Sequence, residues 1–199
     1  PEAATTWAIP PPICPAPATR TCSNLTGRQA NLSAMVTVRE ATAADADAIG
    51  RVHADTWRVA YSGVFPEAAF DVQARQRSWR DMLAREPQPP WAVLVAELAG
   101  AVVGFAGVGR SRDEEDVGEL YAIYVEASTW GSGAGRALIA RAEESLRAYG
   151  FAEAMLWVLE GNERAERFYR AAGWSADGGR KIEAHQGVDV AEVRYRKPL

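Results

Sequence analysis

The chain has 199 residues, of which 48% are hydrophobic, and its formal net charge at pH 7 is -4. This length is enough for one hydrophobic core and short for two, so we expect a single main domain. The acidic balance disfavours a scaffold that holds nucleic acid through phosphate contacts, and no apolar run approaches the roughly 20 residues of a membrane span. We therefore expect a cytoplasmic protein without nucleic-acid or membrane partners.

The first 35 residues differ from the rest of the chain. Prolines cluster between Pro10 and Pro17, and polar residues fill the gaps without helical or strand periodicity, which predicts a disordered extension at 1–35. Met35, the first methionine, stands just before the first strand pattern, so we expect the extension to be upstream sequence and the domain to cover 36–199. Cys14 and Cys22 both lie in the extension, either as a disulfide or as idle thiols, which leaves the domain without a nucleophilic thiol.

Regular patterns begin with a short strand at Val36–Arg39. The run Thr42–Asp45 has the form of a capping box, which predicts a helix start. Apolar or small side chains then recur at three- and four-residue steps as an inward stripe: Ile49, Val52, Thr56 and Val59. A second helix at Val72–Arg85 and a hairpin of two strands follow: Ala92–Glu97 and Val102–Gly109, with the turn at Ala99 and Gly100.

The second half of the domain alternates strands and helices. The charged loop Ser111–Asp116 is expected to be solvated. After it we expect, in order, a strand at Glu119–Val125, a helix at Gly133–Tyr149, a strand at Met155–Leu159, a helix at Asn162–Ala172 and two closing strands, from Trp174 onward and at Val190–Lys197. This order predicts an α/β (α+β) fold, a single domain with a central mixed, mostly antiparallel sheet flanked by helices on both faces.

The most informative motif is a glycine-rich run between a strand and a helix: Trp130-Gly131-Ser132-Gly133-Ala134-Gly135-Arg136. Glycines let a ligand approach the backbone, and the unpaired first amides of a helix, with its dipole, favour a phosphate group. A nucleoside-triphosphate loop would need Lys and then Ser or Thr after the last glycine, and a dinucleotide fingerprint would need glycine at Arg136 or Leu138. Both are excluded, which leaves the pyrophosphate of another cofactor or a tight turn that binds nothing.

Two segments resemble signatures of one family. Leu120–Leu138, with Gly131-x-Gly133-x-Gly135, resembles the acyl-CoA-binding segment of the GCN5-related N-acetyltransferase (GNAT) superfamily, although that family usually has Gln or Arg where this chain has Trp130. The second signature is resembled by Asn162-x-x-Ala165-x-x-Phe168-Tyr169-x-x-x-Gly173-Trp174. In addition, residues 53–63 resemble the acceptor-side helix and loop of a bacterial branch.

The resemblance covers about residues 36–199 and implies a single GNAT-like domain. It implies transfer of an acetyl group from acetyl-CoA to a primary amine by direct attack in a ternary complex, without a metal. The acceptor would be a small-molecule or protein amine, and family analogy suggests a homodimer. A non-catalytic acyl-CoA binding or sensing module is the alternative. The cofactor-binding residues implied are Ile123, Tyr124, Val125, Gly131, Ser132, Gly133, Ala134, Gly135, Arg136, Asn162 and Tyr169.

Two residues are expected to act in catalysis. Tyr169 would protonate the departing thiolate, or else serve as a core aromatic. Asn162 is seven residues earlier, hence on the same helix face, and is also suited to cap the helix. Glu119, which aligns with the catalytic glutamate of the GCN5 histone acetyltransferases, would be the base, or else a solvated strand end. Strand alternation is expected to place four residues on one side: Glu119, Tyr121, Ile123 and Val125.

The acceptor side is less well marked. Trp57 and Tyr61 are expected to line it because they precede a loop at Ser62 and Gly63, although large aromatics are more often core residues. The two histidines, His53 and His185, are expected to be solitary, without a cluster of metal ligands. Three basic residues near the end are expected to be strand-edge charges: Arg194, Arg196 and Lys197.

Overall fold

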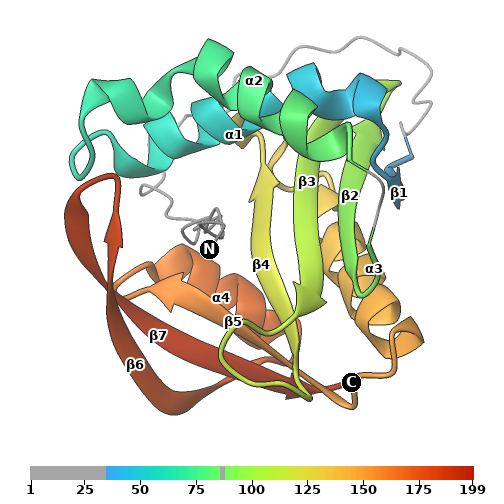
Figure 1. Cartoon of the computed structure of the whole chain (residues 1–199), viewed down its shortest axis with the longest axis vertical. Coiled ribbons are helices and arrows are strands. Elements are labelled where there is room, and N and C mark those ends of the chain that lie inside the picture. The colour runs from blue at the N-terminus through green and yellow to red at the C-terminus, as the bar shows by residue number, and fades with distance from the viewer. Residues whose placement is uncertain (1–34, 86–87) are drawn as a thin grey trace, which may run out of the picture.

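The computed structural model describes residues 35–85 and 88–199. In these residues, seven strands form one sheet in the order β1-β2-β3-β4-β5-β7-β6, and helices cover both of its faces (Figure 1). Neighbouring strands are antiparallel except β4 and β5, which are parallel. The predicted fold class is confirmed. Most of the expected extension, with both cysteines, lies outside the described residues.

The predicted elements are present, with ends displaced by one or two residues. The strands are β1 (Thr37–Glu40), β2 (Trp91–Leu98), β3 (Ala101–Arg110), β4 (Gly118–Val125), β5 (Glu153–Leu159), β6 (Ser175–His185) and β7 (Val188–Pro198). The α-helices are α1 (Ala46–Tyr61), α2 (Val72–Leu83), α3 (Ala134–Ala148) and α4 (Glu163–Ala171). None of these helices is both long and apolar enough to cross a membrane.

The sheet carries a separate core on each face. On one face, α3 and α4 bury side chains such as Leu138 and Tyr169, and on the other α1 and α2 bury Trp57 and Trp79. Val59 was expected in the inward stripe of α1, but 41% of it is exposed, so that prediction was wrong. Because an α-helix turns about 100° per residue, the buried side of α1 continues through Trp57 and Tyr61 instead.

A bulge in β4 decides which side chains reach each face. Two adjacent residues of β3 pair with Leu120 and Ala122, so Tyr121 is an extra residue on β4. Beyond Tyr121 the alternation shifts. Ile123 packs with Leu120 in the core under α3 and α4, whereas Tyr124 packs in the core under α1 and α2. The bulge therefore overturns the prediction of one common side for Glu119, Tyr121, Ile123 and Val125.

β4 and β5 begin side by side and then separate. Their parallel pairing is confined to Gly118 with Ala154 and Glu119 with Met155. Beyond these pairs, β5 continues beside β7 while β4 continues beside β3 to Val125 (Figure 1). In the described residues, the later part of β4 thus has a strand neighbour on one side only.

The loop before β4 is anchored. Glu114 in this loop forms ion pairs with Arg194, at 2.7 Å, and with Arg196. Asp113 accepts a hydrogen bond from the Trp157 indole at 2.9 Å. The loop is therefore not simply solvated.

The basic residues of β7 do not lie on an edge strand. Because β6 pairs with the outer side of β7, the prediction of strand-edge charges at Arg194, Arg196 and Lys197 was also wrong.

Candidate active site

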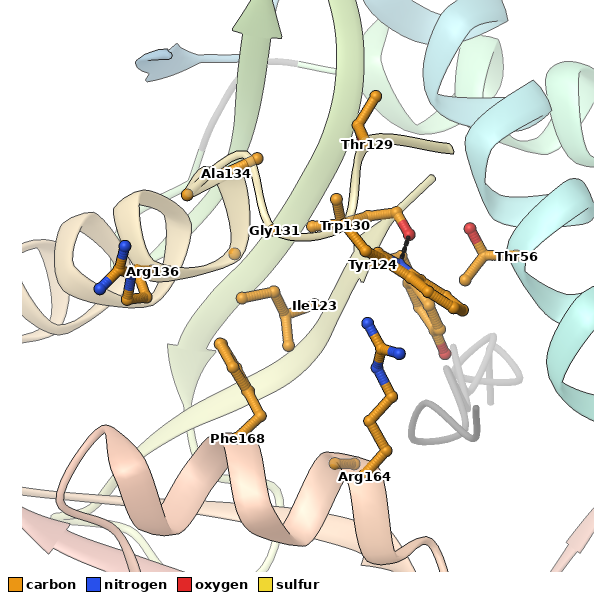
Figure 2. Close-up of a pocket in the computed structure, with 14 residues that line it drawn as sticks. Thr56, Ile123, Tyr124, Thr129, Trp130, Gly131, Ala134, Arg136, Arg164 and Phe168 are labelled. Atoms are coloured by element: carbon orange, nitrogen blue, oxygen red, sulfur yellow. Dashed lines mark hydrogen bonds between the residues drawn. The ribbon is translucent and has the colours of Figure 1, made fainter. Parts of the chain in front are cut away.

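A cavity of about 310 Å³ lies beside the separated end of β4 (Figure 2). Its wall comes from the end of β4, the glycine-rich turn, the first two turns of α4 and Thr56 of α1. Most of the expected cofactor residues line it: Ile123, Tyr124, Val125, Gly131, Gly133, Ala134, Gly135 and Arg136. Ser132, Asn162 and Tyr169 do not.

The glycine-rich turn has the conformation that an anion site needs. Gly131 and Gly133 have φ angles of +85° and +95°, which L side chains rarely adopt, and Gly133 is the N-cap of α3. Gly135 is favoured for a different reason, because a Cβ there would lie 3.3 Å from the Phe168 ring, closer than ordinary van der Waals contact. The amides of the first turn of α3 have no intrahelical acceptor, and the helix dipole adds positive potential beside the cavity.

Trp130 and Arg164 form a stacked pair on the cavity wall (Figure 2). The indole nitrogen of Trp130 donates to the Val125 carbonyl at 2.9 Å, which ties the turn to the end of β4. The guanidinium carbon of Arg164 lies 3.6 Å from the Trp130 ring centroid. With Arg136, this gives the wall two cations. Sequence reasoning missed Arg164, whose available signal was its place two residues after the helix cap, on the turn of α4 nearest the glycines.

Asn162 caps α4 and keeps one donor group unused. Its Oδ1 accepts from the Ala165 amide at 3.1 Å, which confirms the capping prediction. The side chain is 2% exposed, and its Nδ2 has no hydrogen-bond partner in the part of the chain that the structure describes. A buried donor without a partner costs about 1–3 kcal/mol. This group therefore suits a ligand that brings an acceptor.

Tyr169 is buried in the core under α3 and α4, close to Tyr195 and Trp174. It is 2% exposed, and no described residue forms a hydrogen bond with its hydroxyl. Burial, followed by the nearby Tyr124 hydroxyl, raises the pKa of Tyr169 well above its usual range. The phenol therefore stays protonated at neutral pH, the state that a proton donor requires.

Glu119 is buried and held by Arg112. Its Oε2 accepts from the Arg112 backbone amide at 2.9 Å, and its Oε1 from the Arg112 Nε at 3.2 Å. The Arg112 Nη2 forms a further ion pair with Oε1. At 1% exposure, Glu119 is not a solvated strand end. Both carboxylate oxygens of Glu119 therefore already accept hydrogen bonds from Arg112.

Trp57 and Tyr61 lie behind the cavity wall. Both are buried in the α1 core with Phe65, and neither lines the cavity. The Trp57 indole donates to the Tyr124 hydroxyl at 3.1 Å, so it supports a residue of the wall. Their neighbour Thr56 is the residue of α1 that lines the cavity.

The two histidines have different surroundings. His53 is a core residue, whose Nδ1 accepts from the Trp79 indole at 3.2 Å and whose ring stacks on Tyr124. His185 lies on the β6–β7 hairpin with Glu183 and Glu192, and their ligand atoms are within 4.8 Å of one another. The expectation of a solitary His185 was wrong because β6 and β7 pair in a hairpin, which brings Glu192 beside His185.

Residues 51–174 match the family model described as Acetyltransferase (GNAT) family. The chain belongs to this family. It is an N-acetyltransferase, as its relatives are named. One is the uncharacterized N-acetyltransferase YuaI of Bacillus subtilis, 37% identical over 134 residues that cover 64% of this chain and 74% of that protein. A mycothiol acetyltransferase of Thermobispora bispora is 36% identical over 121 residues, and the match covers 55% of this chain but 41% of that longer protein.

Solved structures share the GNAT fold. The ribosomal-protein-alanine N-acetyltransferase of Brucella melitensis is 27% identical, with a TM-score of 0.65 over 82% of this chain and 99% of its own. The acetyltransferase yncA of Salmonella typhimurium, solved with acetyl-CoA, is 20% identical with a TM-score of 0.63, covering 82% of this chain and 94% of its own. At that identity the second likeness concerns the fold alone.

Proposed function

We propose that this GNAT protein transfers an acetyl group from acetyl-CoA directly to a primary amine, both bound at once. The observation that carries the proposal is the cavity where β4 leaves β5, because it joins an anion-binding helix start to an open strand edge. The mycothiol and ribosomal-protein-alanine acetyltransferases among the matched proteins differ in their named acceptors. We therefore propose the acceptor only as a class, a primary amine of a small molecule or a protein.

The residues on the cavity wall fit coenzyme A. First-turn amides of α3, with Arg136 and Arg164, would hold the diphosphate. The unused Nδ2 of Asn162 would donate to an amide carbonyl of the pantetheine arm. The edge of β4 from Ile123 to Val125, which lacks a described strand neighbour toward β5, would hydrogen-bond that arm as a strand does. When bound, the thioester supplies an activated acetyl group with a thiolate as leaving group.

Tyr169 would act as the acid and keep its proton until the sulfur leaves. Its raised pKa, due first to burial, ensures that the phenol is not lost as a donor at neutral or mildly alkaline pH. Amines of the lysine type have a pKa of about 10.4 and must lose a proton to react. The sequence predicts Glu119 as the base, but Arg112 occupies both of its oxygens, so the proposal leaves the base unassigned.

The test is thiol release from acetyl-CoA across a panel of spermidine, glucosamine and a peptide with an N-terminal alanine. We expect wild-type protein to release thiol with at least one of these, and Tyr169→Phe to lower kcat about 100-fold with unchanged acetyl-CoA affinity. Tyr195→Phe is the matched control, since this neighbouring hydroxyl bonds Glu166 and Arg170 instead.

Two results would contradict the proposal. Equal kcat in Tyr169→Phe and wild type would remove Tyr169 from the chemistry. Binding of acetyl-CoA without thiol release for any amine would instead favour the non-catalytic binding module.

A further inference from the structure

The β6–β7 hairpin carries a buried acid–base cluster that the proposed chemistry has not used. Glu183 and His185 alternate on one side of β6, and Glu192 lies on β7. His185 and Glu192 are 4% and 2% exposed, whereas Ile182 on the opposite side of β6 is 70% exposed. The cluster therefore faces into the molecule.

His185 and Glu192 form a dyad with one ring nitrogen to spare. The Nε2 of His185 lies 3.2 Å from the Glu192 Oε1. Its Nδ1 is buried and has no hydrogen-bond partner among the described residues. When Nε2 carries the hydrogen and donates it to Glu192, Nδ1 holds the basic lone pair. A carboxylate that fixes an imidazole in this way is the usual means of presenting a histidine base.

Glu192 faces the side of the sheet that α1 and α2 cover, as Val190 two residues earlier does. Glu192 pairs with Leu159, the last residue of β5 and thus the strand from which β4 separates. Its neighbours Val188 and Val190 pack in the core that contains Tyr124. Burial and, to a lesser extent, the Glu192 carboxylate raise the pKa of Tyr124. Tyr124 lines the cavity, so the core that Val188 and Val190 share contains a residue of the cavity wall.

Nearby cations balance the carboxylates. The Lys181 ammonium lies 2.5 Å from Glu183 and 3.5 Å from Glu192, between the two acids. Arg112, from the loop before β4, acts on Glu183 by its charge, and Arg194 lies further along the side of β7 that bears Glu192. The carboxylates of the cluster thus have cations on the neighbouring strand and loop.

We propose that His185, oriented by Glu192, is the base that takes the proton from the acceptor amine. The inference rests on the proposed acetyl transfer. Nδ1 of His185 first takes a proton from the ammonium form of the amine and passes it to solvent. As the neutral nitrogen then bonds to the acetyl carbon, a second N–H proton passes to Nδ1. The carbon–sulfur bond breaks, and the sulfur takes the proton of the Tyr169 hydroxyl. The imidazolium then gives its proton to solvent, and Tyr169 regains one from solvent. Glu119, held by Arg112, keeps a structural role.

Two variants distinguish a role of His185 as base from a role as hydrogen-bond partner of Glu192. His185→Gln keeps an amide N–H for Glu192 but has no basic nitrogen, and His185→Ala leaves room for added imidazole. With the best amine of the panel, both should lower kcat/KM about 100-fold at neutral pH, with an unchanged thermal shift by acetyl-CoA. The loss should shrink near pH 9.5, where more of the amine is already neutral, and imidazole should restore His185→Ala. Glu160→Gln, an exposed carboxylate on the loop after β5, is the control.

Other results would overturn the assignment in distinguishable ways. If the wild type is active and His185→Gln has the same pH profile, His185 is not the base, although the acetyl transfer itself stands. A 100-fold loss in Glu119→Gln would instead assign the role of base to Glu119. Failure of imidazole to restore a folded His185→Ala would also refute it. Loss of activity with EDTA and recovery with Zn²⁺ would make the cluster a metal site. A wild type that binds acetyl-CoA but acetylates no amine would remove both the function and the base.

Discussion

Replacement of Gly133 by glutamate should abolish acetyl-CoA binding while leaving a folded protein. With a φ of +95°, any L residue at Gly133 costs about 1–2 kcal/mol, but a Cβ there meets no atom within 4 Å, so the fold tolerates the side chain. A carboxylate about 4 Å from a phosphate repels it by roughly 4 kcal/mol at an effective dielectric of 20. This corresponds to about 1000-fold weaker binding.

A thermal shift assay converts this loss into a clear difference. At a concentration 100 times its Kd, acetyl-CoA adds about 2.7 kcal/mol to the free energy of unfolding. For a domain of this size, that is a rise in Tm of roughly 5–10 °C. At the same concentration Gly133→Glu would gain less than about 0.1 kcal/mol, a shift too small to detect.

Gly150 supplies the matched control at the opposite end of α3. Its φ is +91°, and a Cβ there also meets no atom within 4 Å, so Gly150→Glu carries a similar conformational cost away from the cavity. It should lower the Tm of the free protein while keeping the full shift. An undiminished shift in Gly133→Glu would refute the placement of the diphosphate.

Two further predictions concern charged residues. Arg164→Met should raise the Kd for coenzyme A about 10-fold and make binding less sensitive to salt, because the variant loses a phosphate contact and the stacking on Trp130. Isothermal titration at two ionic strengths checks this. Arg167→Met, an exposed change on the same helix, should have neither effect. Arg39 lowers the pKa of Asp45 to about 2, so the pair stabilises the fold fully above about pH 4 and loses this contribution as pH falls through 2. Asp45→Asn should therefore lower the free energy of unfolding by roughly 1–2 kcal/mol at pH 7, but by much less near pH 2, as measured by urea denaturation; equal losses at both pH values would contradict the ion-pair explanation.

The sequence was a good guide where local chemistry decides the structure. The glycine-rich turn and the Asn162 cap follow from backbone geometry and helix capping, and the structure has both. The placement of Tyr169 beside the cavity rather than on its wall was not evident, because it depends on how α4 packs on the sheet.

Features that depend on distant residues could not be predicted. The bulge at Tyr121 arises from pairing with β3, and it reverses the sides of later β4 residues. The contacts of Arg112 with Glu119 and of Glu192 with His185 join residues only seven apart, but each depends on how the chain turns between them. Arg164 was missed because its place two residues after the helix cap does not by itself show that it contacts Trp130.

The narrow junction between β4 and β5 also has a mechanical consequence. With Gly118–Ala154 and Glu119–Met155 as the paired residues between them, the sheet consists of two plates joined at one corner. One plate bears the glycine turn and the other bears α4, so a molecule that touches both Trp130 and Arg164 braces them against each other. A bound donor would therefore add a second connection across the cavity, beside the Trp130–Arg164 stack.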